Sequence, residues 1–128
     1  MDWNNINSIR TEIEKQGMYI VPGFKYFYWP GKGISYDSRD HSPEAPSAIA
    51  HEVGHWQLGH TDAAGDPWLQ FHQEVDAWDL ALSKGFRPRK DFVRGRIEQY
   101  SKPVFDYMGN EKGKESLNDM ERMLSKYY

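Results

Sequence analysis

The sequence predicts an α+β fold, with a small antiparallel sheet of about three strands packed against about four to five helices. Residues 18–36 form short aromatic and β-branched runs separated by prolines and glycines, which is typical of strands and turns. The segments on both sides instead repeat apolar residues at the spacing of amphipathic helices. Because 128 residues suffice for one modest core, we expect a single domain over 1–128.

The first predicted element is an amphipathic helix over residues 2–16. Its apolar residues recur at helical spacing and end before Gly17, a residue suited to the left-handed position after a helix. These residues are Trp3, Ile6, Ile9 and Ile13. We interpret the segment as a packing helix without a further role.

Three strands are predicted at 18–21, 24–29 and 33–36. Pro22-Gly23 and the stretch 30–33 separate them as turns, so each strand is expected to pair with the next in an antiparallel meander. The aromatic side chains of these strands are expected to contribute to the core.

Three helices are predicted in the second half of the chain. The first begins after Asp66, an N-cap residue followed by Pro67 at the first helical position, and it ends near Lys84, before Gly85. The other two span 89–108 and 115–126.

The segment 47–60, before these three predicted helices, contains His51-Glu52-Val53-Gly54-His55. This run matches the H-E-x-x-H pattern of zinc peptidases. Residues four apart lie on one face of a helix, so His51 and His55 can direct both imidazoles to one point, as zinc requires. Glu52 lies about 100° round the helix, which suits a general base acting on a zinc-bound water better than a third ligand.

The motif helix carries further signals. The motif helix has two alternative N-cap residues, Ser42, which is next to Pro43, and Ser47. Gly54 weakens a helix, and we expect it to permit close packing of another element. The apolar face, separate from the histidine face, consists of Ile49, Val53 and Trp56.

Glu74, on the next predicted helix, is the candidate third ligand. It follows His55 by 19 residues, and the small side chains of Ala77 and Ala81 beside it would let the two helices approach closely. Two histidines and one carboxylate leave the fourth position of Zn²⁺ open for water. We therefore predict one zinc per chain, bound by His51, His55 and Glu74; the alternative for Glu74 is an ordinary exposed glutamate.

Four other polar residues are weaker candidates for the site. His60 is one residue short of the spacing required for a third histidine ligand, so we do not assign it to the metal. His41 is expected to be an exposed loop residue. Tyr100 and Tyr107 are candidate donors to an oxyanion, although packing in the core or at the surface is the more common role of tyrosine.

Charge is divided along the chain, whose net charge is −3. Residues 37–79 hold nine acids and one base, which gives −8 and favours cation binding. Residues 84–114 hold nine bases and four acids, which gives +5. The basic block lacks a recognised nucleic-acid motif, so we expect a solvated helix face rather than a nucleic-acid interface.

Cysteine is absent, which excludes disulfides and thiolate zinc sites. The chain has no apolar run long enough to span a membrane, and residues 1–5 lack the basic and apolar regions of a signal peptide. We therefore expect no membrane partner and a cytoplasmic location.

The stretch 47–82 resembles the gluzincin metallopeptidases, in particular the single-domain minigluzincins and the related ImmA/IrrE-type proteases. The resemblance rests on the H-E-x-x-H run, its continuation to His60 and Glu74-Val75-Asp76-Ala77. It implies a zincin-like fold, with His51, His55 and Glu74 as zinc ligands and Glu52 as the catalytic base. Some minigluzincins are held latent by their own termini, which makes the Tyr127-Tyr128 tail a candidate cover.

The sequence therefore predicts a zinc metalloendopeptidase that hydrolyses a protein or peptide substrate, which an edge strand beside the metal would align by β-augmentation. The alternative is a non-catalytic zinc-binding interaction domain, such as an antitoxin- or repressor-associated scaffold. An open fourth metal position favours the enzyme. A side chain such as His41 or His60 in that position favours the alternative.

Overall fold

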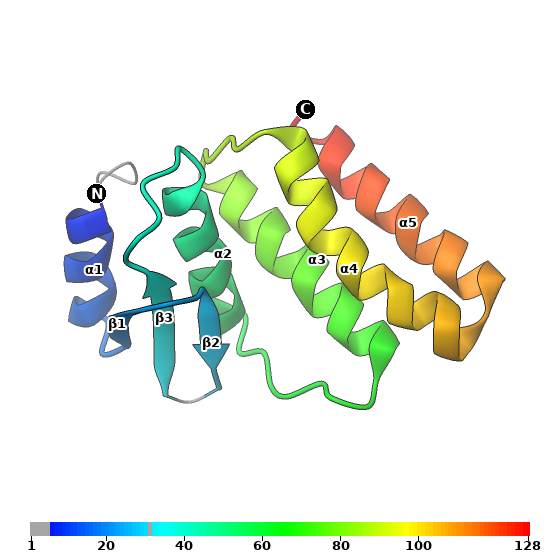
Figure 1. Ribbon diagram of the computed structural model, residues 1–128, viewed down its shortest axis with the longest axis horizontal. Coiled ribbons are helices and arrows are strands. Elements are labelled where there is room, and N and C mark those ends of the chain that lie inside the picture. Colours follow the sequence, from blue (N-terminus) through cyan, green and yellow to red (C-terminus); the bar gives the residue numbers. More distant parts are fainter. Residues whose placement is uncertain (1–5, 31) are drawn as a thin grey trace.

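The computed structural model describes residues 6–30 and 32–128, and these form five helices and three strands. Trp3 with the rest of 2–5, and Gly31 in the second predicted turn, lie outside the described residues. The predicted α+β class is confirmed, and Figure 1 shows the elements crossing the molecule from α1 beside the sheet to α5 at the far side. The elements are α1 (Ile6–Lys15), β1 (Tyr19–Gly23), β2 (Phe27–Trp29), β3 (Gly33–Asp37), α2 (Ala45–Gln57), α3 (Pro67–Ser83), α4 (Lys90–Met108) and α5 (Asn110–Ser125).

The sheet is mixed, so the predicted antiparallel meander is wrong. Its strand order is β1-β3-β2, with β1 parallel to β3 and β2 antiparallel to β3. β3 suits the central place, since residues 33–36 are buried whereas β1 and β2 keep exposed residues. Gly33 permits the contact with β1, because a Cβ at this position would collide with the backbone of Tyr19.

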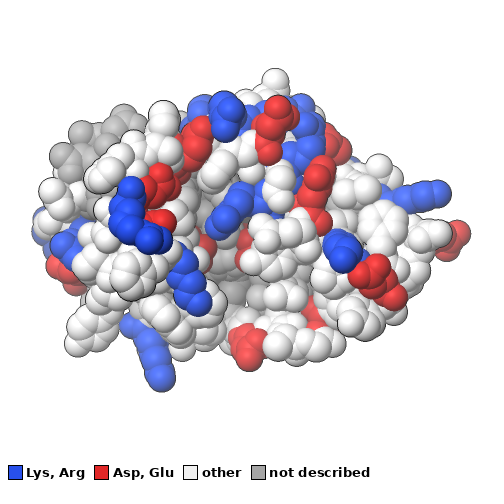
Figure 2. Space-filling model, in the orientation of Figure 1, with Lys and Arg blue, Asp and Glu red and all other residues white. Residues whose placement is uncertain are grey.

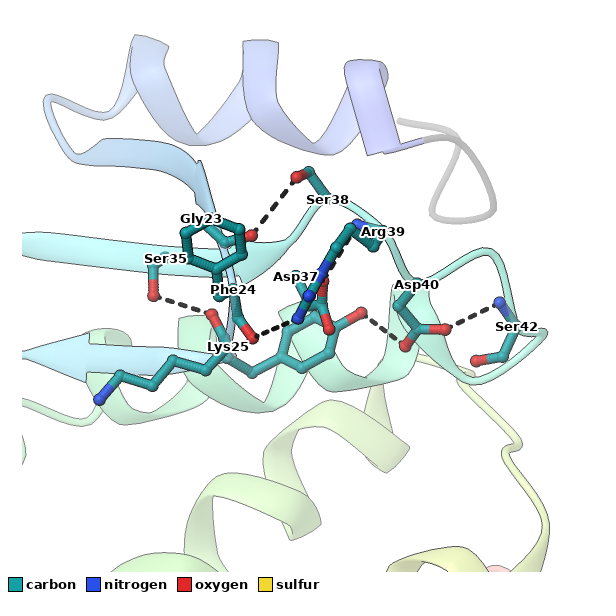
Figure 3. Close-up of polar contacts among 10 residues, drawn as sticks. Gly23, Phe24, Lys25, Ser35, Asp37, Ser38, Arg39, Asp40 and Ser42 are labelled. Atoms are coloured by element: carbon teal, nitrogen blue, oxygen red, sulfur yellow. Dashed lines mark hydrogen bonds and ion pairs between the residues drawn. The ribbon is translucent and has the colours of Figure 1, made fainter.

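The link from β1 to β2 crosses the end of β3 instead of turning back as a hairpin. The backbone carbonyls of residues 23–25 accept three hydrogen bonds from side chains in β3 or just after it (Figure 3). The donors are Ser35 Oγ at 2.9 Å, Ser38 Oγ at 3.3 Å and Arg39 Nη2 at 3.3 Å. These contacts fix the crossover and so set the position of β2.

Two hydrophobic clusters fill the molecule, one on each side of α2. The first, between one sheet face and helices α1 and α2, consists of Ile9, Ile13, Met18, Ile20, Ile34, Tyr36, Ile49 and Val53. The second joins α3, α4 and α5, and its members include Phe71, Trp78, Leu82, Ile97, Val104, Met120 and Leu124. The opposite face of the sheet stays exposed and carries Tyr19, Val21, Phe27 and Trp29.

The start of α2 differs from the prediction. The helix begins at Ala45, and its N-cap residue is Glu44, whose side chain makes no capping hydrogen bond. Neither Ser42 nor Ser47 therefore caps the helix, and Ser47 is buried inside it. Pro46 in the first turn has no amide hydrogen, which removes one of the donors that a cap would satisfy.

The later helices follow the predictions with one exception. The Asp66 side chain accepts a hydrogen bond from the Leu69 amide at 3.0 Å, as expected for the N-cap of α3. α5 begins at Asn110 instead of 115, because Gly109, with a φ of 96°, ends α4 and turns the chain directly into the next helix. Within the described ranges, no helix combines the length and the apolar character needed to cross a membrane.

Candidate metal centre

The motif helix places its apolar and its polar side chains on different faces. Ile49 and Val53 pack in the first hydrophobic cluster, as predicted, whereas His51, Glu52 and His55 line a cleft. Each of these three polar residues keeps only between 4% and 6% of its surface exposed. The helix therefore holds the H-E-x-x-H side chains together in a setting largely shielded from water.

Glu74 of α3 faces both histidines. Its Oε2 lies 2.7 Å from His51 Nε2, and its Oε1 lies 3.0 Å from His55 Nε2. The carboxylate therefore bridges the two imidazoles across the contact between α2 and α3. The structure brings the three predicted ligands together, and their binding of a metal stays a prediction.

Gly54 allows this close approach of α2 and α3. A Cβ on Gly54 would lie 2.7 Å from the carbonyl oxygen of Ala77 and 3.2 Å from its Cα. Ala77 follows Glu74 by three residues, so the point of contact and the bridging carboxylate share one face of α3. The predicted role of Gly54, close packing of another element, is confirmed.

The donor set fits a divalent metal such as zinc. His51, Glu52 and His55 offer ligand atoms that all lie within 4.8 Å of one another. However, Glu52 Oε1 lies 3.2 Å from Nδ1 of His51, on the other side of the ring from Nε2. Because Glu74 contacts Nε2 of both histidines, it suits the third ligand position better than Glu52 does.

The same side chains form a buried ion-pair network. Burial disfavours a charged His51, but the carboxylates of Glu74 and Glu52 outweigh it and raise the pKa of His51 to about 9. Burial likewise opposes ionisation of Glu74, yet the charges and hydrogen bonds of His51 and His55 keep its pKa well below the usual range. A proton on His51 therefore neutralises Glu74 near neutral pH, and a metal at Nε2 has to displace that proton.

His60 contacts the motif in a way that the sequence did not predict. Its Nδ1 lies 2.8 Å from Nδ1 of His55, so one ring donates a hydrogen bond and the other accepts it. Gly59, with a φ of 67°, turns the chain back so that the His60 amide donates to the carbonyl oxygen of His55 at 3.0 Å. A glycine directly after a helix was the available signal for this return. His60 thereby orients His55 with Nε2 toward Glu74.

Two aromatic rings, neither predicted here, flank the histidines. The Trp78 ring stacks on His51, with 4.5 Å between ring centroids and 11° between planes. Tyr28 of β2 stacks on His55 at 5.8 Å and 8°, and its hydroxyl donates to the carbonyl oxygen of His60 at 2.9 Å. The sheet, α2 and α3 therefore all contribute to the orientation of the two imidazoles.

The centre opens into a cleft of about 410 Å³ between the sheet and the later helices. Residues 26–30 form one wall, and the other carries Gln70 and Gln73 of α3 with Arg96 and Tyr100 of α4. Figure 2 shows a hollow near the middle of this face, with acidic and basic side chains at its rim. The cleft gives the buried centre access to a ligand from solution.

Of the two tyrosines proposed as donors, only Tyr100 lines the cleft. Burial raises its pKa to about 12, and the charges of Glu74 and Glu52 add to the rise. Its hydroxyl therefore stays protonated at neutral pH and can donate a hydrogen bond. Tyr107 is 82% exposed and does not line the cleft.

The C-terminal tail lies away from the cleft. The Tyr127 hydroxyl donates to the carbonyl oxygen of Asp79 at 3.1 Å, and the Tyr128 hydroxyl donates to that of Pro88 at 2.5 Å. Figure 1 places the C-terminus near the link between α3 and α4. The proposed cover thus packs against α3 and the following loop, and His41 is an exposed loop residue, as expected.

The inference of function rests on the side chains gathered in this cleft. The candidate metal centre combines two imidazoles, a bridging carboxylate and a second carboxylate within one accessible cleft. No protein-family model, curated protein or solved structure matches this chain.

Proposed function

We propose that this protein is a zinc-dependent metallopeptidase that hydrolyses peptide bonds in a protein or peptide substrate. The observation that carries the proposal is the convergence of His51 Nε2 and His55 Nε2 on the Glu74 carboxylate, beside an open cleft. The resemblance to minigluzincins points to the same function. Both the resemblance and the cytoplasmic location stay predictions.

His51, His55 and Glu74 would hold the metal, as two neutral imidazoles and one carboxylate. Zinc in such a site lowers the pKa of a water toward about 7 and polarises a carbonyl group. Glu52, buried next to His51, would take a proton from the attacking water and deliver it to the leaving amine. The protonated hydroxyl of Tyr100 would donate a hydrogen bond as negative charge develops on the carbonyl oxygen.

The edge of the sheet supports a peptide as substrate. β2 is an edge strand, and residues 26–30 line the cleft beside the metal centre. An extended peptide can pair with such an edge through backbone hydrogen bonds. This alignment would place one peptide bond opposite Glu52, and it would depend little on the side chains of the peptide.

The rival function is a non-catalytic zinc site that serves protein interaction. It would require a fourth side chain to complete the metal coordination. His60 is hydrogen-bonded to Nδ1 of His55, and His41 is exposed, so neither residue contacts the Nε2 side of the centre. A fourth position left to water would favour catalysis over a structural role.

The decisive experiment measures zinc content and peptide cleavage in parallel. Native mass spectrometry of the parent is expected to find about one zinc per chain. Glu74→Ala removes a ligand, so it should weaken zinc binding more strongly than the loss of an outer-sphere partner does. That loss typically costs roughly 10- to 100-fold in affinity. Glu52→Gln should keep zinc and lower kcat for a peptide library by at least about a hundredfold.

Glu44→Gln is the matched control, since Glu44 lies at the start of the same helix and pairs with Arg89 at 3.2 Å. It should keep both zinc and activity. Zinc binding without cleavage of any library peptide would move the assignment to the rival function. A parent that takes up no zinc would contradict both.

A further inference from the structure

One cleft residue has no part in the proposed hydrolysis. Arg96 lies on α4, four residues before Tyr100, and both side chains line the same wall of the cleft. Arg96 is half-buried, so its charge is partly removed from water. A partly desolvated guanidinium needs hydrogen-bond acceptors to offset that loss.

The Arg96 side chain makes no ion pair and no hydrogen bond to the residues that the structure describes, which sets it apart from the other arginines. Each of the other arginines has a partner: Arg10 pairs with Glu14, Arg39 with Asp37, Arg87 with the Leu82 carbonyl oxygen, Arg89 with Glu44, Arg94 with Glu121 and Arg122 with Asp119. The neighbouring acids of the cleft are already engaged. Glu74 pairs with His51 and His55, Glu52 lies 3.2 Å from His51 Nδ1, and Asp62 accepts a hydrogen bond from the Ala64 amide at 2.9 Å.

The guanidinium lies within electrostatic range of both walls. Burial raises the pKa of Tyr26 and of Tyr100, and the charge of Arg96 opposes that rise at both hydroxyls. Tyr26 belongs to the wall next to β2, and Tyr100 belongs to α4. A ligand lying between these walls would therefore meet the positive charge of Arg96.

We propose that Arg96 binds a carboxylate of the peptide substrate and so selects peptides that carry this group close to the cleaved bond. The inference rests on the proposed peptidase function and adds the substrate class. A planar guanidinium can bind both oxygens of a carboxylate through two parallel hydrogen bonds. The carboxylate has two possible sources, an Asp or Glu side chain and the C-terminus of the peptide.

The test measures the binding of four fluorescent octapeptides of otherwise identical sequence. They carry either Glu or Gln at the centre, and either a free or an amidated C-terminus. Fluorescence polarisation is recorded with zinc-loaded Glu52→Gln protein, in which cleavage does not consume the ligand, and with the same protein carrying Arg96→Gln or Arg94→Gln. Arg94 lies two residues away on α4 and pairs with Glu121 at 2.7 Å, so it is the matched control.

We expect the peptide with its carboxylate in the recognised position to bind at least about tenfold more tightly than its neutral counterpart. Arg96→Gln should abolish that difference and leave the neutral peptide unchanged, and Arg94→Gln should preserve it. A preference for central Glu would identify a side-chain carboxylate as the ligand. A preference for the free C-terminus would identify a terminal carboxylate.

Equal binding of all four peptides, equal weakening of all four by Arg96→Gln, or no binding to any protein up to millimolar concentration would overturn the inference. Cleavage by the parent with intact Glu52 is measured separately. If carboxylate peptides bind through Arg96 but none is cleaved, the peptidase function fails and the recognition role stands. If peptides are cleaved without this preference, the recognition role fails and the peptidase function stands.

Discussion

Two pairs of consecutive helices in this molecule pack through a glycine, and they bury very different groups. α2 meets α3 where Gly54 touches the backbone of Ala77, and α4 meets α5 where Gly113 lies under the ring of Phe105. The α2–α3 contact buries four ionisable side chains, His51, Glu52, His55 and Glu74. The α4–α5 contact buries two hydroxyls, Ser101 and Ser116, whose oxygens lie 2.6 Å apart.

The two contacts therefore differ in what they cost the fold. Removing an ion from water costs several kcal/mol, and the attraction between partners only partly offsets this cost. A pair of hydrogen-bonded hydroxyls carries no such cost. The α2–α3 contact therefore keeps costly ionisable groups buried, as the proposed metal centre requires, whereas the α4–α5 contact buries only neutral groups.

The largest expected difference between the two contacts is in their response to pH. The raised pKa of His51 means that its ion pairs stabilise the metal-free fold fully below pH 6.5 and lose this effect as pH rises to about 9. The lowered pKa of Glu74 means that its contribution is present above pH 4.5 and lost as pH falls. Thermal unfolding in chelator should show a loss on the order of 3 kcal/mol between pH 6.5 and 9.

Glu74→Gln is the control for this pH dependence, since it removes the carboxylate that contributes most to the pKa of His51. The variant should lose most of the dependence above pH 6.5. A parent and variant with parallel stability curves over this range would show that the buried network does not hold a proton.

The second comparison replaces each of the two glycines with alanine. Gly54→Ala places a methyl group against the backbone of Ala77, which cannot move without shifting α3, so we expect a loss of about 1–3 kcal/mol and weaker zinc binding. Gly113→Ala would place a Cβ 2.3 Å from Cγ of Phe105, so this half-buried ring has to turn aside. Since the nearest atoms belong to a side chain and not to the backbone, the loss should be smaller and zinc binding unchanged. Urea unfolding and zinc titration measure the two effects.

Gly95→Ala provides the control for the glycine series. Gly95 is exposed within α4 and has no atom within 4 Å of an added Cβ, so alanine should raise stability by about 0.5–1 kcal/mol. Equal losses for Gly54→Ala and Gly113→Ala, with zinc binding intact in both, would contradict a special role for the α2–α3 contact.

The smallest expected effect concerns the buried hydroxyls. Ser116→Ala leaves the Ser101 hydroxyl without its partner and should cost about 1 kcal/mol. Ser101→Ala should cost less, because the Ser116 hydroxyl still donates to the carbonyl oxygen of Gly113 at 2.6 Å. Removing both should cost less than the sum, because no unpaired hydroxyl remains. Zinc affinity should be unchanged throughout, and a zinc defect in the double variant would mean that the two helix pairs are coupled.

Local signals in the sequence were enough to predict most of the helices and the convergence of the three candidate ligands. The spacing of His51 and His55 places both rings on one helix face, and Asp66-Pro67 marks the start of α3. Gly54 and Ala77 indicated that the two helices could approach closely, which put Glu74 within reach of the motif. Each of these inferences depends on residues at most about one helical turn apart, or on one short connection.

Strand order and the surroundings of the histidines depend on contacts that no local pattern specifies. Pro22-Gly23 looked like a turn but continues β1, and the real crossover is held by side chains beyond β3. Tyr28 reaches His60 across 32 residues, and Arg96 reaches the cleft only after α4 packs. His60 alone carried a local signal, the glycine before it.

The central position of β3 has a consequence for partial unfolding. β1 and β2 occupy opposite edges of the sheet, and only β2 borders the cleft. Detachment of α1 with β1 would open the first hydrophobic cluster and bare one edge of β3, yet it would leave α2 in contact with both β2 and α3. Amide exchange in the N-terminal segment can therefore proceed through a subglobal opening that does not dismantle the candidate metal centre.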